Sequence, residues 1–294
     1  MYDIAIIGGG PAGLTAAIYA RRAGKKCLVL EATACGGQML NTNKITNYPA
    51  LSSVSGAELA QNMENQATEL GAEIEFDKVT AINPTDGGFE IIGEDDKYSA
   101  RAVIIATGTT PRKLNLPHED ELTGRGISYC ATCDGAFFKD KIVAVYGGGY
   151  SAAYSALYLA DIAAKVYLIH HRNELRATGD VVDTLRNNPK VQMLLGSEIA
   201  GLLGEDKLTG IELSDGRKVD LNGLFVSIGR EPKCDFCNEL ATDGEGFIAA
   251  DEGCETSISG IFVAGDVRTK ALRQIVTATA GGAAAAEAAI KYLA

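Results

Sequence analysis

The chain of 294 residues carries a formal net charge of −11, and hydrophobic residues make up 46% of it. Nucleic-acid binding depends on clustered basic charge that displaces counterions, so this acidic balance excludes that class of function. No apolar run reaches the roughly 18 to 20 residues that a membrane span needs, so we expect no membrane partner.

The N-terminal segment has a strand, glycine loop, helix and strand pattern. An apolar run at residues 2–7 leads into Gly8-Gly9-Gly10-Pro11-Ala12-Gly13, a helical pattern to about residue 23 and a second apolar run at 27–30. The glycines permit a sharp turn and let the backbone approach a pyrophosphate at the helix N-terminus. Glu31, 18 residues beyond Gly13, suits a ribose diol and therefore the adenosine half of FAD. Because the first strand starts at Tyr2, no room remains for a secretion signal, and we expect a cytoplasmic protein.

The next segment continues the same domain. Its patterns predict a helix at 56–70, strands at 73–76 and 89–92, and an apolar strand at 102–106. That strand ends in Thr107-Gly108-Thr109-Thr110-Pro111, a turn-rich sequence and a natural exit from the first domain.

A candidate redox site follows in the sequence Cys130-Ala131-Thr132-Cys133-Asp134. Two thiols at this spacing can close a disulfide, and the adjacent Asp134 is placed to carry a proton. Zinc needs four ligands, and the other CxxC pair, Cys234/Cys237, lies about 100 residues away, so we exclude a zinc site. Cys27, Cys35 and Cys254 are interpreted as small buried hydrophobes.

The strand and glycine-loop pattern then occurs a second time. A run at 142–146 leads into Gly147-Gly148-Gly149-Tyr150-Ser151-Ala152, a helical stretch to about 162 and a strand at 165–169. Here the second strand ends in His170-His171-Arg172, with Arg176 four residues on, instead of a carboxylate. Cations at this place favour a 2′-phosphate and hence NADPH, held by Gly147, Gly149, Ala152, Arg172 and Arg176. The alternative is that these are surface charges on a loop.

Two glycine motifs about 139 residues apart predict an α/β fold with two Rossmann-like dinucleotide-binding domains. Further strands are expected at 191–195, 208–213 and 223–228, and the segment 260–266 with a final helix would complete the first domain. The second domain, 112–240, would therefore be inserted into a first domain made of 1–111 and 241–294. The chain would then cross between the two domains twice, near residues 111 and 241, and such a pair of crossings has the geometry of a hinge.

Taken together, the motifs resemble the low-molecular-weight thioredoxin reductase family across essentially the whole chain. The matching blocks are Gly8–Gly13, Gly36-Gly37-Gln38, Asn47-Tyr48-Pro49, Ala106-Thr107-Gly108, Cys130–Gly135, Gly265-Asp266 and Arg273-Gln274-Ile275-Val276-Thr277. In this family the redox pair lies within the inserted domain, just before the second glycine loop, as it does here.

This resemblance implies roles for individual residues. The FAD pyrophosphate would be held by Gly8, Gly10 and Gly13, and the adenosine side by Glu31 and the turn at 106–108. Cys133 would accept electrons from the flavin, Cys130 would attack the disulfide of thioredoxin, and Asp134 would be the acid/base group. The ribityl chain and flavin ring would contact Gln38, Asn47, Asp266 and Gln274, and the same blocks contribute Gly37, Thr107, Gly108, Gly265, Arg273 and Ile275.

The second glycine motif departs from the family pattern. Tyr150 stands where a small polar residue is usual, and Tyr154 and Ser155 replace a pair of glutamates; His171 replaces an arginine. A helix stripe such as Tyr150, Tyr154 and Tyr158 is more often core packing, yet Tyr150 could obstruct a pyrophosphate. These changes favour an alternative electron donor, reduced ferredoxin, used by a nicotinamide-independent branch that resembles this family.

Three further expectations complete the sequence-based account. Cys234/Cys237 could form a regulatory disulfide near the second crossing, the alternative being two ordinary loop cysteines. The resemblance implies a homodimer. Rival functions are a flavin reductase or oxidase that ignores both Cys130 and Cys133, and a flavin-bearing redox sensor without turnover.

Overall fold

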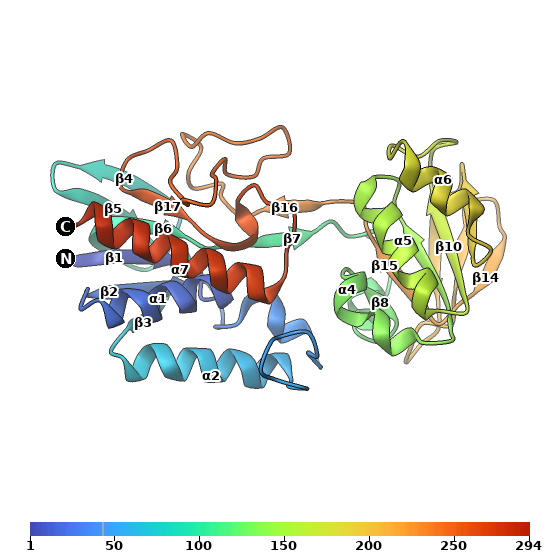
Figure 1. Ribbon diagram of the computed structural model, residues 1–294, viewed down its shortest axis with the longest axis horizontal. Coiled ribbons are helices and arrows are strands. Elements are labelled where there is room, and N and C mark those ends of the chain that lie inside the picture. Colours follow the sequence, from blue (N-terminus) through green and yellow to red (C-terminus); the bar gives the residue numbers. More distant parts are fainter. Residues whose placement is uncertain (43) are drawn as a thin grey trace. The chain divides into compact units, whose positions relative to one another are not determined.

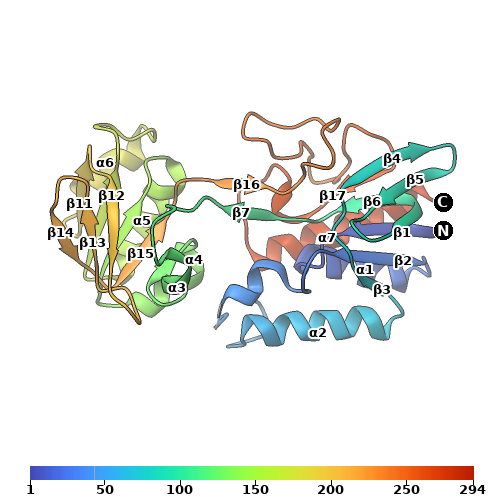
Figure 2. The ribbon, with the colours of Figure 1, turned by 180° about the vertical axis from the view of Figure 1, so that it is seen from behind.

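The computed structural model describes residues 1–42 and 44–294 and divides the chain into two compact units, shown from opposite sides in Figures 1 and 2. Unit 1 comprises Met1–Thr110 and Glu231–Ala294, and unit 2 is the inserted segment Pro111–Arg230. The first crossing lies within one residue of the predicted boundary, but the second lies ten residues earlier than predicted. The reason is that Cys237 and Leu240, in an irregular segment, pack into the core of unit 1.

Unit 1 is built on a mainly parallel sheet with the strand order β3-β2-β1-β6-β5-β4, and β17 pairs with β6 as well. The antiparallel strands β5 and β4 extend one edge (Figure 2). The strands are β1 (Tyr2–Ile7), β2 (Cys27–Glu31), β3 (Glu73–Phe76), β4 (Ala81–Thr85), β5 (Gly88–Ile92), β6 (Lys97–Ile105) and β17 (Ile261–Val263).

Both faces of the unit 1 sheet are covered, which explains why the inner parts of its central strands, residues 4–7 of β1 and 102–105 of β6, are apolar. On β1, Ile4 and Ile6 pack in the cluster that holds the helices, whereas Ala5 and Ile7 pack on the opposite face. The helices are α1 (Pro11–Arg22), α2 (Gly56–Glu69) and α7 (Ile275–Tyr292), and Figure 1 shows α1 and α7 side by side. This close approach depends on Gly282, where a Cβ would lie 2.1 Å from the Ala12 carbonyl oxygen.

Unit 2 is a second parallel sheet, with the order β11-β10-β9-β15-β8. Helices α5 (Tyr150–Ile162) and α6 (Asp180–Asn187) pack on one face. An antiparallel three-stranded meander packs on the other face. The strands are β8 (Ile127–Ser128), β9 (Ile142–Tyr146), β10 (Lys165–His170), β11 (Val191–Leu195), β15 (Gly223–Val226), and the meander β12 (Ile199–Leu203), β13 (Gly210–Leu213) and β14 (Lys218–Asp220).

The two glycine-loop units predicted from the sequence are both present, and the expected α/β fold is confirmed. The crossings themselves are short strands, β7 (Thr109–Pro111) and β16 (Arg230–Pro232), which pair with each other. Among residues 1–42 and 44–294, no helix combines the length and apolar character that crossing a membrane requires.

Candidate functional site

The first glycine loop joins β1 to α1 and has room for no side chain at two of its positions. Gly8 has a φ of 106°, and a Cβ there would lie 2.5 Å from the Ala106 carbonyl oxygen. A Cβ on Gly13 would lie 1.8 Å from the carbonyl oxygen of Gly8. At Gly10, the N-cap of α1, no atom lies within 4 Å of where a Cβ would be. The loop is therefore closed toward the protein and open at the helix N-terminus, where unpaired N–H groups favour an anion.

Glu31 lies beside this loop at the end of β2. Its Oε2 accepts a hydrogen bond from the backbone N–H of Gly9 at 2.7 Å, and its Oε1 accepts one from Thr33 at 3.1 Å. These contacts fix the carboxylate next to the helix N-terminus, as an adenosine ribose requires, and leave acceptor capacity on both oxygens.

Other predicted FAD contacts are brought to the same end of unit 1. The N–H of Gly36 bonds to the carbonyl of Gly9 at 2.8 Å, which places the turn η1 (Gly37–Asn41) against the loop. The Gln38 side chain donates to the Thr109 carbonyl at 2.7 Å. This arrangement ties η1 to the exit of β6, where Thr107 and Gly108 also lie.

The N-terminus of α7 completes this group. Gln274 is its N-cap, and the Asn47 amide donates to the Gln274 Oε1 at 3.1 Å although 227 residues separate them. The Arg273 guanidinium donates a hydrogen bond to the Asp266 carbonyl at 3.2 Å. Its central carbon also lies over the Phe247 ring, 4.0 Å from the ring centroid. Gly265 and Asp266 belong to η3 (Gly265–Val267), and Ile275 begins α7. The open helix N-terminus, the fixed carboxylate and these amides fit an FAD molecule.

The predicted redox site lies in unit 2, where Cys130 and Cys133 form a disulfide with a Cα–Cα distance of 5.3 Å. The backbone N–H of Cys133 bonds to the Cys130 carbonyl at 3.3 Å. This turn begins the short helix α4 (Ala131–Asp134), and both cysteines are half-buried.

Ser128, which sequence analysis did not identify, holds this site together. Its buried hydroxyl lies 2.6 Å from the Asp134 Oδ2, to which it donates, and it accepts the Cys130 N–H at 3.0 Å. Burial raises the pKa of the Asp134 carboxyl, and the Ser128 hydrogen bond partly offsets that rise. Asp134 therefore keeps its proton to higher pH than an exposed aspartate does. A serine two residues before a CxxC turn is the signal that could have identified it.

Replacing Ser128 by alanine removes the hydrogen bond that lowers the Asp134 pKa, so we expect that pKa to rise further. The free energy of unfolding should fall by about 1–2 kcal/mol, because Asp134 and the Cys130 N–H lose a partner. Carboxyl carbon NMR over a pH series measures the pKa. Ser151→Ala, at an exposed position of α5, is the control. A Ser128→Ala protein whose Asp134 pKa is unchanged or lower would contradict this arrangement.

The second glycine loop repeats the geometry of the first with different side chains. Gly147 has a φ of 154°, Gly149 is the N-cap of α5, and Ala152 is fully buried. His170 takes the place that Glu31 has in unit 1: its Nε2 would lie 2.3 Å from a Cβ on Gly148. Burial lowers the His170 pKa, so the ring is neutral at pH 7.

The predicted phosphate-binding arginines lie on the segment that follows β10. Arg172 and Arg176 are exposed, and the Arg176 guanidinium lies 3.4 Å from where a Cβ on Gly149 would be. The backbone N–H groups of Arg176 and Ala177 bond to the Gly148 carbonyl at 2.7 and 3.1 Å. The structure therefore brings Arg176 beside the glycine loop, as a 2′-phosphate would require, whereas Arg172, within the described part of the chain, shows no contact with the loop and acts electrostatically on His170.

The tyrosine stripe on α5 is not core packing. Tyr150, Tyr154 and Tyr158 are all exposed, and the first two rings stack with centroids 6.5 Å apart. The Tyr150 hydroxyl lies 2.9 Å from the Thr178 hydroxyl, a hydrogen bond that holds the ring at the first turn of α5. The ring therefore stands at the helix end where a pyrophosphate would bind.

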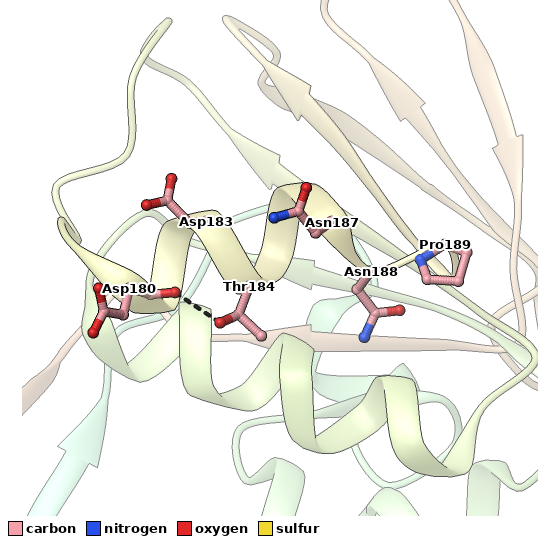
Figure 3. Close-up of a pocket in the computed structure, with 6 residues that line it drawn as sticks. All are labelled: Asp180, Asp183, Thr184, Asn187, Asn188 and Pro189. Atoms are coloured by element: carbon pink, nitrogen blue, oxygen red, sulfur yellow. Dashed lines mark hydrogen bonds between the residues drawn. The ribbon is translucent and has the colours of Figure 1, made fainter.

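A separate hollow in unit 2, of about 550 Å³, runs along α6 and contains none of the predicted site residues (Figure 3). It is lined by Asp180, Asp183, Thr184, Asn187, Asn188 and Pro189. The Thr184 hydroxyl donates to the Asp180 carbonyl at 2.7 Å within the helix. These contacts belong to the helix itself, and we assign the hollow no role.

Comparison with known proteins agrees with this geometry. Residues 2–282 match the family model described as pyridine nucleotide-disulphide oxidoreductase. A thioredoxin reductase of Peptoclostridium acidaminophilum is 43% identical, covering 100% of this chain and 97% of the relative, and one of Treponema pallidum (strain Nichols) is 41% identical, covering 99% and 97%. The crystal structure of thioredoxin reductase from Streptococcus pyogenes MGAS5005 has a TM-score of 0.94 and 41% identity, with 100% and 98% covered.

Proposed function

The chain belongs to the pyridine nucleotide-disulphide oxidoreductase family and, within it, to the thioredoxin reductases, and from this premise we propose that it reduces thioredoxin through Cys130 and Cys133. It is an FAD-dependent disulfide oxidoreductase. The observation that carries the proposal is the Cys130–Cys133 disulfide beside the half-buried Asp134. Bound FAD supplies the pair of electrons that reduces this disulfide. Gly8, Gly10 and Gly13 would hold its pyrophosphate, and Glu31 its ribose.

The cysteines carry the electrons onward by thiol–disulfide exchange. Two electrons break the Cys130–Cys133 bond and leave two sulfurs that can be protonated. Cys130 then attacks one sulfur of the thioredoxin disulfide, forming a mixed disulfide and releasing the other sulfur as a thiolate. Cys133 attacks the Cys130 sulfur, which restores the protein disulfide and releases reduced thioredoxin.

Asp134 supplies the proton that the departing thioredoxin thiolate needs. Its raised pKa means that the protonated form persists to higher pH than it would for an exposed aspartate. The rate of the proton-dependent step should therefore fall as pH rises through that raised pKa. Replacing Asp134 by asparagine would remove this pH dependence.

We propose NADPH as the electron donor, because Arg176 lies beside the second glycine loop and the exposed Arg172 lies on the same segment after β10. One observation favours a second donor, reduced ferredoxin: the Tyr150 ring is held over the first turn of α5 by Thr178. The paired strands β7 and β16 would serve as the hinge that lets unit 2 present either the nicotinamide or the disulfide. From the family resemblance we also propose a homodimer, which light scattering can test.

The donor is tested by mixing the FAD-loaded protein anaerobically with NADPH, NADH or reduced ferredoxin and following the flavin absorbance. We expect NADPH to bleach the flavin at least about tenfold faster than NADH, since a guanidinium–phosphate contact contributes about 1.5–3 kcal/mol. Arg172→Ala should remove this preference, and Arg186→Ala, on α6, should keep it. Bleaching by ferredoxin alone would assign the second donor and overturn NADPH.

A further inference from the structure

A second CxxC pair lies in unit 1, outside the predicted FAD contacts and the redox disulfide. Cys234 is partly exposed and Cys237 is buried, and both are free thiols. The backbone N–H of Cys237 bonds to the Cys234 carbonyl at 3.0 Å. This is the same turn as in the redox pair, where the corresponding bond is 3.3 Å and the disulfide is closed.

The turn brings the two thiols within bonding reach of each other. A β-turn with this hydrogen bond holds its terminal Cα atoms within about 7 Å, and disulfides span about 4.4–6.8 Å between Cα atoms. The Cys234 thiol donates only a long contact, 3.8 Å, to the Gly246 carbonyl. The turn therefore already holds the two Cα atoms within disulfide range, and joining the sulfurs requires rotation of the side chains but no unfolding of the turn.

Both cysteines line a hollow of about 610 Å³ that opens on the surface of unit 1. This volume lies within the range of small-molecule sites, about 300–1,000 Å³. Its charged lining residues are Glu231, Asp235 and Glu245 against Lys233, a formal charge of −2. Among the described residues, no group of three or more histidine, cysteine, aspartate or glutamate side chains is arranged to hold a metal ion.

We propose that Cys234 and Cys237 form a second redox-active pair that is oxidised by small, cationic disulfides entering this hollow. The Cys234 thiolate attacks one sulfur of the small disulfide, breaking its S–S bond and releasing one thiolate. Cys237, after losing its proton to solvent, attacks the Cys234 sulfur and releases the second thiolate. Two protein thiols are oxidised to a disulfide, and the small disulfide is reduced to two thiols.

The order of attack follows from burial. Burial raises the pKa of the Cys237 thiol to about 11, and it also raises that of the less buried Cys234, where Asp235 adds to the effect. Cys234 is therefore the entry point, and the rate of closure should increase with pH as both thiols ionise. The pair stands next to Lys233, whose N–H bonds to the Gly108 carbonyl at 3.2 Å and whose carbonyl accepts the Thr107 hydroxyl at 2.5 Å. Closure would fix the segment that follows β16.

The test is thiol counting after exposure of the fully reduced, FAD-loaded protein to cystamine, a dicationic disulfide. After denaturation and alkylation, trypsin releases the peptide 234–268, which holds Cys234, Cys237 and Cys254. We expect this peptide to carry three alkyl groups before oxidation and one afterwards, the buried Cys254 serving as the internal standard. Three alkyl groups retained after exposure would overturn the proposal.

Two controls make the result specific. Dithiodipropionate is a dianionic disulfide of similar size, and we expect it to close the pair at least about tenfold more slowly at low ionic strength, the difference disappearing in salt. Equal rates would refute the cationic preference. The double variant Cys130→Ser/Cys133→Ser should close the second pair at the wild-type rate. Loss of closure in that variant would show that oxidation arrives from the redox disulfide and would contradict a separate site.

Discussion

Replacing Cys133 by serine should abolish the reduction of oxidised thioredoxin, lowering kcat by on the order of 10³-fold or more, and Cys130→Ser should do the same. The reason is that each thiol is needed twice, first to accept electrons and then to form or resolve the mixed disulfide. Turnover is measured with oxidised thioredoxin and whichever donor bleaches the flavin. Both variants should retain yellow, bound FAD, because the predicted FAD contacts all lie in unit 1.

Ala136→Ser is the matched control, since it changes one exposed residue three positions after Cys133. It should keep wild-type turnover. A Cys130→Ser or Cys133→Ser protein that still reduces thioredoxin would rule out the dithiol route. The same result would favour a flavin reductase or oxidase that ignores both cysteines.

Gly13→Ala should destabilise the protein by about 3 kcal/mol and prevent it from retaining FAD. The added Cβ would lie 1.8 Å from the Gly8 carbonyl oxygen, so α1 must move away from the loop. Overpacking of this kind typically costs about 1–3 kcal/mol, and here the obstacle is backbone that cannot change rotamer. Urea unfolding and the flavin content after gel filtration measure the two effects.

Two other glycines separate folding from cofactor binding. At Gly10 and Gly244 nothing lies within 4 Å of an added Cβ. Gly10→Ala should lower stability by less than about 1 kcal/mol, yet weaken FAD binding because the methyl group points into the open helix end. Gly244→Ala should change neither. Tight FAD retention by Gly13→Ala would contradict the assignment of this loop.

Much of the fold was predictable because local sequence and global structure agree in the two glycine-loop units. The apolar runs at 142–146 and 191–195 became β9 and β11 with the predicted bounds, and Gly8, Gly13 and Gly147 stand where backbone contacts exclude a Cβ. The central strand β9 is buried along most of its length, so its sequence signal is strong, and the half-buried edge strand β11 still carries an apolar run. By contrast, β12 and β14 were not identified, since one face of a short meander strand carries little hydrophobic pattern.

The site residues that form one contiguous sequence motif could be predicted, whereas those whose role depends on tertiary packing could not. The CxxC and the aspartate after it could be recognised directly. Ser128 could not, because its importance arises only when α4 turns back and brings Asp134 to its hydroxyl. The exposure of Tyr150 likewise depends on tertiary packing, since a stripe with helical spacing does not indicate which side of the helix is covered.

The most direct test of the central claim is to trap the intermediate between the enzyme and thioredoxin. The Cys133→Ser protein, mixed with oxidised thioredoxin, should accumulate a mixed disulfide because the thiol that resolves it is missing. Peptide mapping should then find thioredoxin joined to Cys130 in the tryptic peptide 126–139. A linkage at Cys234, or no linkage at all while thioredoxin is still reduced, would contradict the account.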